Sequence, residues 1–309
     1  MERDLLMHLP VVVAVAHRGG FAAAASSLGM TASAVSHAVR QVEERIGQPL
    51  FARTTRSVAL TEAGRTLIAT IGPALADVAD GLDRVRSIRG KASGHLRINA
   101  PRIAMPMALA AIAAEMALRH PDVTLEIVAD DGLTDIVELG FDAGIRLGGM
   151  VAQDMVAVAL TPPFRAMMVA SPAYLARRGI PADIAALPSH NCIAFRLIRS
   201  GGVYAWEVRE HGRDMSIMTG GSAIVTDPLQ ARDLALAGVG IAYIFEPLVR
   251  ADLTQGRLVT VLPETAIEEP GLFVYFPKRA SLAPKLRAFI DVTRAMRERA
   301  TSSRNGRST

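Results

Sequence analysis

The feature that most constrains this chain is a pair of short amphipathic helical patterns separated by one glycine. Phe21, Ala24, Ala25 and Leu28 recur at the spacing of a single helix face. Gly29 follows at once, and glycine readily takes the left-handed conformation that ends many helices. The spacing therefore predicts a short helix that stops at Gly29 and turns tightly into the next helix.

The second helical pattern begins after Thr31, whose hydroxyl can cap a helix N-terminus. Its apolar face consists of Val35, Ala38, Val39, Val42 and Ile46, and Gly47 and Pro49 end it. The opposite face presents Ser33, Ser36, His37 and Arg40. Short donors and acceptors near the N-terminal end of a helix suit base edges in a major groove. The two patterns predict a helix-turn-helix, although an ordinary helical hairpin with a solvated polar face would show them as well.

Two short apolar runs after the second helix, 50–53 and 57–60, predict a β-hairpin. The tip of this hairpin carries Arg53, Thr54, Thr55 and Arg56. Such a tip offers hydrogen-bond donors without apolar bulk, which suits contacts with phosphates or the minor groove. The hairpin favours DNA binding over the plain helical hairpin.

The composition is that of a globular protein, since half of the 309 residues are apolar and the formal net charge is +4. Lys91, Lys278 and Lys285 are the only lysines, so the positive charge comes mainly from arginine. Arginine suits phosphate and base recognition, although a GC-rich genome would produce the same bias. The single cysteine, Cys192, excludes an intrachain disulfide. The sequence shows neither a signal peptide nor a run of ~18 apolar residues, so we expect a cytoplasmic protein without membrane contact.

From Gly20 to Gly64 the chain resembles the LysR-type transcriptional regulators. The resemblance rests on the runs GFAAAASSLG (20–29), TASAVS (31–36), VE (42–43), LFARTTR (50–56) and LTEAG (60–64), which keep the spacing of the family motif. It implies an all-α winged helix-turn-helix over residues 1–60 that binds double-stranded DNA through Thr31 and the polar residues named above. Ala32 departs from the family, which often carries glutamine there, so base reading is expected to shift to the neighbouring polar residues.

A long helical pattern and a hinge follow over residues 61–93. A heptad seam runs along this helix, formed by Ile71, Leu75, Val78, Leu82 and Val85. The resemblance implies that this linker helix pairs with its copy, which gives a dimer or a tetramer. A proline inside a helix costs ~3 kcal/mol, so we expect a break or bend near Gly72 and Pro73.

From Gly94 onward, strand-like and helical runs alternate, which predicts an α/β fold. The expected strands are 96–100, 123–128, 143–147, 165–170, 192–195, 241–244 and 272–276. The expected helices are 107–119, 133–140, 227–237 and 282–299. The runs 141–148, 171–175 and 270–277 resemble the periplasmic-binding-protein-like effector domain of the same family. The resemblance implies an effector domain over 94–300 with two lobes, 94–162 with 269–300 and 163–268, while the polar tail 301–309 is expected to be disordered.

Ligands of α/β sheets bind beyond the carboxyl ends of strands, where helix N-termini also point. This rule predicts a small-molecule effector site formed by Pro101, Arg102, Ile103, Phe195, Arg196, Thr226 and Asp227. The two arginines favour an anionic effector. An equally simple interpretation is that both are surface arginines.

The sequence predicts no catalytic residue, no metal site and no cofactor. His190 and Cys192 lack a second pair at zinc-site spacing, and 238–240 lacks the third glycine of a dinucleotide-binding motif. Asp130 and Asp131 are expected to lie in a solvated loop. Three histidines are expected to be without partners: His8, His17 and His95. The alternatives are a two-lobed solute-binding protein and an enzyme with an appended DNA-binding domain.

Overall fold

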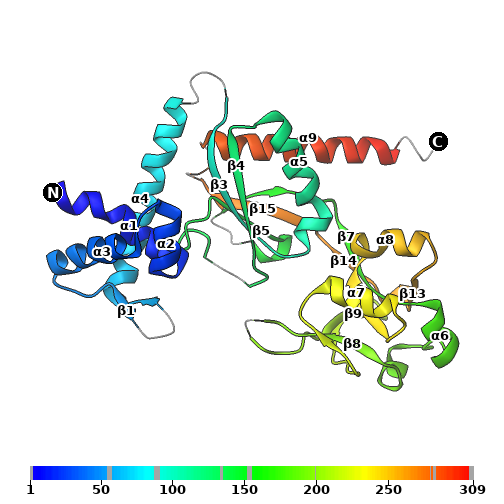
Figure 1. Ribbon diagram of the computed structural model, residues 1–309. Helices are drawn as coiled ribbons and strands as arrows, with labels where there is room; N and C mark the ends of the chain where they lie inside the picture. Colours follow the sequence, from blue (N-terminus) through cyan, green and yellow to red (C-terminus); the bar gives the residue numbers. More distant parts are fainter. Residues whose placement is uncertain are drawn as a thin grey trace.

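The computed structural model describes residues 3–53, 58–86, 91–132, 135–151, 155–198, 200–278, 280 and 283–305. Three parts follow one another along the chain (Figure 1). A helical N-terminal domain lies at one end of the molecule, a sheet flanked by helices lies in the middle, and a second α/β lobe lies beyond it.

The N-terminal domain is a three-helix unit followed by a small hairpin. Its elements are α1 (Arg3–Arg18), α2 (Phe21–Leu28), α3 (Ala32–Ile46), β1 (Phe51–Arg53) and β2 (Val58–Leu60). Gly29 ends α2 with a left-handed φ of 63°, and Gly47 ends α3 with a φ of 74°. The Thr31 hydroxyl accepts a hydrogen bond from the Ala34 amide at 3.1 Å. These contacts confirm the predicted helix ends.

The core of this domain lies where α1 crosses α2 and α3. Val12 and Val15 of α1 are fully buried with Val35 and Val39 of α3, and Ile68 from the following helix closes the core. Burying a side chain of this size stabilises a fold by about 1.5–3 kcal/mol. The first helix therefore provides much of the platform on which the other two are held.

The linker helix α4 (Glu62–Arg86) is continuous through Pro73, so a break at this position is wrong, whereas a bend stays a prediction. Proline at this position removes the hydrogen bond to the carbonyl group of Ala69. Ala69 is exposed, so water can satisfy that carbonyl without an interruption of the helix.

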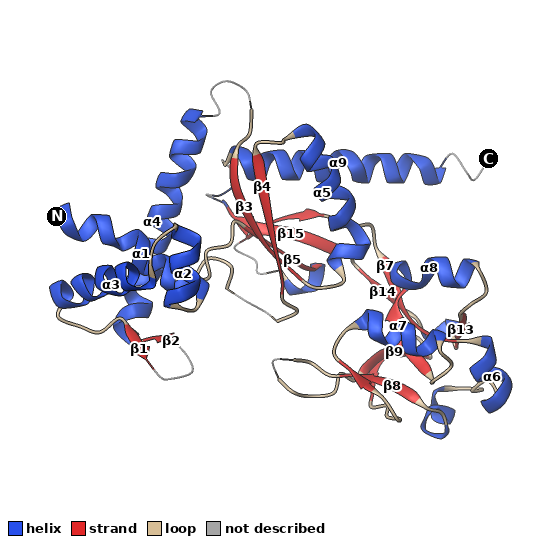
Figure 2. Ribbon diagram, viewed as in Figure 1, coloured by secondary structure: helices blue, strands red, loops and turns tan. Residues whose placement is uncertain are grey.

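The first lobe, lobe I, is a five-stranded sheet in the order β4-β3-β5-β15-β6. Its elements are β3 (Gly94–Ala100), β4 (Val123–Ala129), β5 (Ala143–Leu147), β6 (Met155–Ala159), β15 (Leu272–Pro277), α5 (Ala110–Arg119) and α9 (Pro284–Asn305). β3 is parallel to β4 and β5, whereas β15 is antiparallel to β5 and β6. The helices α5 and α9 lie side by side against the sheet (Figure 2). Leu96 and Ile98 of β3 belong to the core formed with these helices, whereas Arg97 and Asn99 alternate to the opposite face.

The second lobe, lobe II, is built around a six-stranded sheet and a separate hairpin. The sheet consists of β7 (Phe164–Ala170), β8 (Cys192–Phe195), β11 (Ile224–Val225), β12 (Ile241–Phe245), β13 (Val259–Val261) and β14 (Ile267–Glu269). The helices are α6 (Pro172–Arg178), α7 (Pro228–Leu236) and α8 (Glu246–Thr254), and the hairpin is β9 (Trp206–Glu210) with β10 (Arg213–Ile217).

The chain passes between the lobes twice, after β6 and after β14. The two passages touch, because the Leu272 amide donates to the Thr161 hydroxyl at 2.9 Å and the Leu160 amide donates to the Leu272 carbonyl at 2.7 Å. Gly271 has a φ of 95°, and a β-carbon there would lie 2.8 Å from the Pro162 carbonyl oxygen. The lobes are therefore joined by two crossing segments held together at one point.

Three predicted elements need correction. The expected helix over 133–140 is a series of turns where it is described, at 135–140. The expected helix over 107–119 starts as a π-helix, η2 (Met105–Leu109), before α5. The tail is helical through Asn305, because α9 continues past 301, so the expectation of disorder is wrong for 301–305; residues 306–309 lie outside the described part. None of the described helices is long and apolar enough to cross a membrane.

Candidate DNA-binding and effector-binding sites

The exposed face of α3 carries the residues predicted to read DNA. Ser33, His37 and Arg40 are exposed and Ser36 is half-buried. The opposite face anchors the helix, because Val35, Ala38, Val39 and Val42 are buried in the domain core. Ser33, His37 and Arg40 are spaced by about one turn, so their side chains line one stripe.

Thr31 holds the N-terminal end of this stripe in place. Its hydroxyl oxygen accepts from the Ala34 amide, so it is used as a helix cap. The hydroxyl proton stays available for donation to an acceptor such as a phosphate oxygen. Thr31 therefore positions the first turn of α3 and keeps one donor for a ligand.

The hairpin is tied to α3 through Glu43. One carboxylate oxygen of Glu43 accepts from the Leu50 amide at 2.8 Å and from the Phe51 amide at 3.3 Å. Arg53 ends β1 opposite Val58 of β2. The predicted contacts Thr54, Thr55 and Arg56 lie outside the described residues. The direction in which the hairpin leaves the domain is thus set by the helix that carries the polar stripe.

The predicted heptad seam on α4 divides into two parts. Ile71 and Leu75 are half-buried and pack against the core of their own domain. Val78, Leu82 and Val85 are 60%, 53% and 65% exposed. The C-terminal half of α4 therefore carries an apolar stripe that the chain itself leaves uncovered.

In lobe I, the predicted effector residues follow β3. The Arg102 amide donates to Asp131 Oδ1 at 2.9 Å, and its guanidinium pairs with the other oxygen of the same carboxylate. Ile103 is only 7% exposed and belongs to the lobe core, and its role as an effector contact stays a prediction. Pro101 and Arg102 remain partly accessible.

In lobe II, the predicted residues come together at the ends of two paired strands. The Arg196 amide donates to the Val225 carbonyl at 2.7 Å, which places Phe195 and Arg196 beside Thr226. The Arg196 guanidinium donates to the Gly201 carbonyl at 2.6 Å. The carboxylate of Asp227 caps α7 by accepting from the Leu229 amide at 2.8 Å. Asp227 thus occupies the helix N-terminus that would otherwise attract an anion.

Two buried polar residues near Arg102 were missed by the sequence analysis. Arg146 of β5 is 2% exposed, and its guanidinium donates to the Asn99 side chain and to the Gly132 carbonyl, both at 2.5 Å. Asn99 is 1% exposed. An arginine within the apolar run of β5 was the available signal, because charged residues are rarely buried without a purpose.

Sequence models of two protein families match this chain. The model described as "Bacterial regulatory helix-turn-helix protein, lysR family" matches residues 6–65, and the one described as "LysR substrate binding domain" matches residues 89–297. The first covers the N-terminal domain and the second covers both lobes. The chain belongs to the LysR family of transcriptional regulators.

Individual relatives of this LysR-type regulator agree with the assignment. The uncharacterized HTH-type transcriptional regulator YcaN of Escherichia coli is 38% identical over 278 residues, covering 90% of this chain and 91% of the relative. The HTH-type transcriptional regulator PgrR of Escherichia coli is 33% identical over 291 residues, covering 94% and 97%. Among solved structures, CrgA, a LysR-type transcriptional regulator from Neisseria meningitidis, superposes with a TM-score of 0.59 at 27% identity over 94% of this chain and 98% of that chain.

The LysR membership decides between the functions that the sequence left open. As a LysR-type regulator the chain binds DNA, carries an effector-binding domain and forms oligomers, and it is not an enzyme. A solute-binding role is not favoured, because the helix-turn-helix model matches the whole N-terminal domain.

The side chains considered for catalysis have structural roles in this LysR-type regulator. Burial raises the pKa of the Cys192 thiol to about 11, which opposes thiolate formation. His190 contacts the Tyr174 hydroxyl at 3.3 Å. Within the described residues, no group of three or more His, Cys, Asp or Glu side chains is arranged to hold a metal ion. Asp131 lies in an exposed loop, as expected, and pairs there with Arg102. His95 lies 3.1 Å from Glu126, so the expectation of a partnerless His95 is wrong.

Proposed function

We propose that this regulator reads DNA sequence through Ser33, Ser36, His37 and Arg40 and anchors itself through Thr31 and the hairpin residues Arg53, Thr54, Thr55 and Arg56. The observation that carries the proposal is the exposed polar stripe of α3, which has a buried apolar face behind it and is tied by Glu43 to the hairpin. A helix held in this way can enter a major groove while the hairpin contacts the backbone. This role places the protein with the DNA, in the cytoplasm.

Sequencing of the DNA that is recovered with the purified protein tests this proposal. We expect enrichment of sites with two similar halves, separated by about one helical turn or a multiple of it. The matched variant Arg40→Ala should recover the same DNA with a changed base preference. Recovery of unselected DNA by the natural protein would contradict sequence-specific reading.

We propose that Val78, Leu82 and Val85 pair with the same residues of a second copy. Their exposure on a helix of a protein that forms oligomers supports this assignment. Ile71 and Leu75 belong to the same seam, but they contribute indirectly, since they fasten α4 to the DNA-binding domain. A paired α4 would hold two DNA-binding domains at one separation, as the reading of two half-sites requires.

We propose that the effector binds between the lobes, where Pro101 and Arg102 of lobe I and Phe195, Arg196, Thr226 and Asp227 of lobe II contribute. We further propose that the effector is anionic. Arg102, Arg146 and Arg196 lie at the strand ends that bound this region, and an anionic group could take the place of Asp131 beside Arg102.

Calorimetric titration with a panel of small carboxylates and their uncharged amides tests the charge of the effector. We expect binding by at least one carboxylate and not by its amide, with a loss of affinity in Arg196→Ala. Preference for an amide or an amine would overturn the anionic assignment. Binding that is unchanged in both Arg102→Ala and Arg196→Ala would overturn the proposed location.

A further inference from the structure

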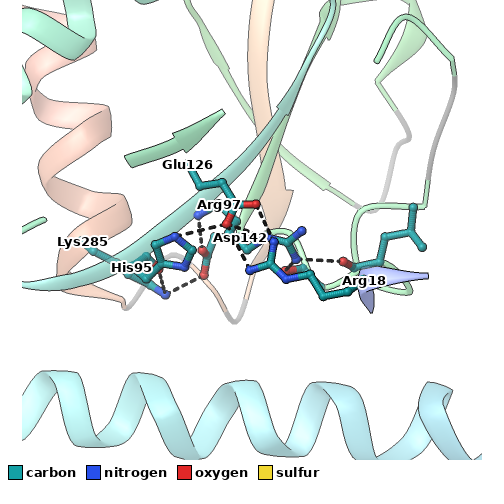
Figure 3. Close-up of polar contacts among 8 residues, drawn as sticks. Arg18, His95, Arg97, Glu126, Asp142 and Lys285 are labelled. Atoms are coloured by element: carbon teal, nitrogen blue, oxygen red, sulfur yellow. Dashed lines mark hydrogen bonds and ion pairs between the residues drawn. The ribbon is translucent and has the colours of Figure 1, made fainter. Parts of the chain in front are cut away.

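The DNA-binding domain touches lobe I of its own chain through the C-terminal end of α1. The guanidinium of Arg18 grips the carboxylate of Glu126 in β4 with both nitrogens, at 2.8 Å and 3.3 Å (Figure 3). The two residues are 108 positions apart in the sequence. A two-pronged arginine–carboxylate contact fixes direction as well as distance.

Glu126 is held from the lobe side by two further groups. Arg97 Nε and His95 Nε2 each lie 3.1 Å from Glu126 Oε2. Partial burial acts to raise the pKa of Glu126, but the hydrogen bonds and charges of Arg18 and Arg97 outweigh it and hold that pKa below its usual range. The carboxylate is therefore charged, as an ion pair with Arg18 requires.

Arg97 connects this carboxylate to the rest of the lobe surface. Its amide donates to Asp142 Oδ2 at 2.7 Å, and its guanidinium lies 4.6 Å from the centre of the Phe141 ring. Asp142 in turn pairs with Lys285 at 2.8 Å. These residues form one connected cluster of charges, and Arg18 contacts it through Glu126 (Figure 3).

His17 fits between the two domains beside this cluster. A β-carbon on Gly140 of lobe I would lie 2.1 Å from His17 Nδ1, so the imidazole sits directly on the glycine backbone. On its other side, a β-carbon on Gly72 of α4 would lie 3.8 Å from His17 Nε2. The imidazole ring therefore lies against two positions that have no side chain, Gly140 and Gly72.

The junction is only partly filled. A cavity of about 280 Å³ remains between α1, α4 and lobe I. It is lined by Pro10 and Val13 of α1, Pro73 of α4, and Phe141 and Pro277 of lobe I. A contact made by a few polar groups around open space has the character of an interface that can separate, unlike a continuous core.

One segment of lobe I links this junction to the proposed effector site. At its start, Asp131 binds Arg102 and the Gly132 carbonyl accepts from Arg146. At its end, Gly140 receives His17 and Asp142 binds Arg97. The two ends of residues 130–142 are thus in contact with the two sites.

We propose that the polar face of lobe I is a docking surface for the DNA-binding domain of the same chain. Through segment 130–142, this docking depends on whether Arg102 and Asp131 are in contact. The dependence on the Arg102 contact rests on the proposed effector site. The partner is recognised by the Arg18 guanidinium entering the Glu126 site and by the neutral His17 ring on Gly140. Docking holds α3, the helix with the exposed polar stripe, in one orientation relative to the lobes.

Pulsed electron–electron distance measurements on the full chain test the docking. Spin labels are placed on exposed positions of the two domains, Ser26→Cys in α2 and Ala114→Cys in α5, in a Cys192→Ser background. Labelled chains are diluted with unlabelled chains, so that only distances within one chain are read. We expect a single narrow distance for the docked chain, and a distance that vanishes on dilution would overturn docking within the same chain.

Two independent variants should release the domain. Gly140→Ala places a methyl group in the His17 ring, whereas Gly256→Ala acts at nearly the same φ, 69° against 67°, with no neighbour within 4 Å. Arg18→Ala removes the Glu126 pair, whereas Arg209→Ala removes a similar two-pronged pair with Asp214 in lobe II. We expect the narrow distance peak to be lost in Gly140→Ala and in Arg18→Ala. It should be retained in the two control variants. A narrow peak retained in both Gly140→Ala and Arg18→Ala would overturn the proposal.

A separate variant tests whether docking depends on the contact between Arg102 and Asp131. Asp131→Ala breaks the contact with Arg102 far from the labels, and we expect it to broaden the distance between them. An unchanged peak would overturn the coupling through segment 130–142. Failure of the effector assignment itself would appear separately, in the titrations described above.

Discussion

A β-carbon on Gly64, in the first turn of α4, would lie 2.1 Å from the carbonyl oxygen of Leu50 at the start of the hairpin. The Leu50 carbonyl also accepts from the Thr61 amide at 3.0 Å, and the Thr61 hydroxyl accepts from the Gly64 amide at 3.0 Å. The linker helix therefore begins directly against the backbone of the hairpin.

Gly64→Ala should destabilise the DNA-binding domain by roughly 1–3 kcal/mol, because the added methyl group must push α4 away from the hairpin. Chemical denaturation measures this loss. The matched variant is Gly72→Ala in the same helix, where the nearest atom would be 3.8 Å away. It should gain up to about 1 kcal/mol from helix propensity, and equal effects of the two variants would contradict the close approach.

Arg40→Ala and Arg53→Ala should weaken DNA binding in different ways. Loss of a base contact by Arg40 should relax the preference at one base position by roughly 1–3 kcal/mol. Loss of a phosphate contact by Arg53 should weaken all sites alike and reduce the slope of affinity against salt by about one. Gel-shift titrations over a set of single-base variants and salt concentrations distinguish the two. The opposite assignment would overturn the division between reading and anchoring.

Val78→Asp with Leu82→Asp should convert the oligomer to smaller species, because two charges would be buried in the paired helices. Sedimentation of the purified protein measures the change. Ala76→Asp adds a charge at an exposed position on the opposite side of the helix, two residues before Val78, and should leave the oligomer intact. A double variant that sediments like the natural protein would exclude α4 pairing.

Docking of the DNA-binding domain should weaken as the pH falls. Burial first, and then the charges of Arg97 and Arg18, lower the pKa of His17 from 6.5 to about 4 in the docked chain. An undocked imidazole with the ordinary value takes up a proton below about pH 6.5, so docking is at full strength above that pH and is lost progressively toward about pH 4. Glu126, with its lowered pKa, adds a further loss below its ordinary value of 4.5.

The distance measurement described for docking reports this dependence. The narrow peak should be unchanged above about pH 6.5 and should shrink as the pH falls from about 6.5 to 5. The other charged or titratable groups at this junction are Asp77 of α4 and the cluster formed by Arg18, His95, Arg97, Glu126, Asp142 and Lys285. His17→Leu should remove the dependence, and a dependence that persists in this variant would assign it to another group.

Asp252→Asn should destabilise lobe II. The Asp252 carboxylate is fully buried and contacts Arg232 Nε at 2.6 Å and Arg257 Nη2 at 2.5 Å. The hydrogen bond from Arg232 is the main cause that holds the pKa of Asp252 below its usual value, against the effect of burial. Breaking such a buried pair costs on the order of 3 kcal/mol. This stability is present above the ordinary pKa of 3.8 and is lost as the pH falls below it.

Denaturation of both proteins over a range of pH checks this expectation. The matched variant is Asp233→Asn, because Asp233 also lies near Arg232, at 3.5 Å, but is 69% exposed. It should change stability by less than about 0.5 kcal/mol. A loss of the same size in Asp233→Asn would show that burial of Asp252 is not the cause.

The N-terminal domain was predictable because its signals are local. Gly29, Thr31 and Gly47 act on backbone within a few residues of themselves, so their roles follow from the printed sequence. The alternation of strands and helices in the lobes was equally visible. By contrast, β10 is five residues long and exposed along most of its length, so only Met215 and Ile217 could indicate a strand.

The site residues were harder to predict because their roles depend on distant parts of the chain. Ile103 follows a strand end as Arg102 does, but it is buried by neighbours that only the folded lobe supplies. His17 has no partner in its own helix, and the glycine that receives it lies more than a hundred residues further on. A break was expected at Pro73 because proline usually interrupts a helix. The helix continues because water can reach the Ala69 carbonyl that Pro73 leaves without a donor.

Strand β15 is inserted between β5 and β6, although it is made more than a hundred residues after both. During synthesis, the DNA-binding domain and lobe II are thus complete before lobe I can close. A message cut short before residue 272 would still encode α3 and the hairpin, but neither the interior strand β15 of lobe I nor α9. Such a fragment would expose the apolar edges of β5 and β6, so proteolysis or aggregation is its expected fate. The sensor is therefore the last part of this regulator to be finished, long after the helix that carries the DNA-reading residues.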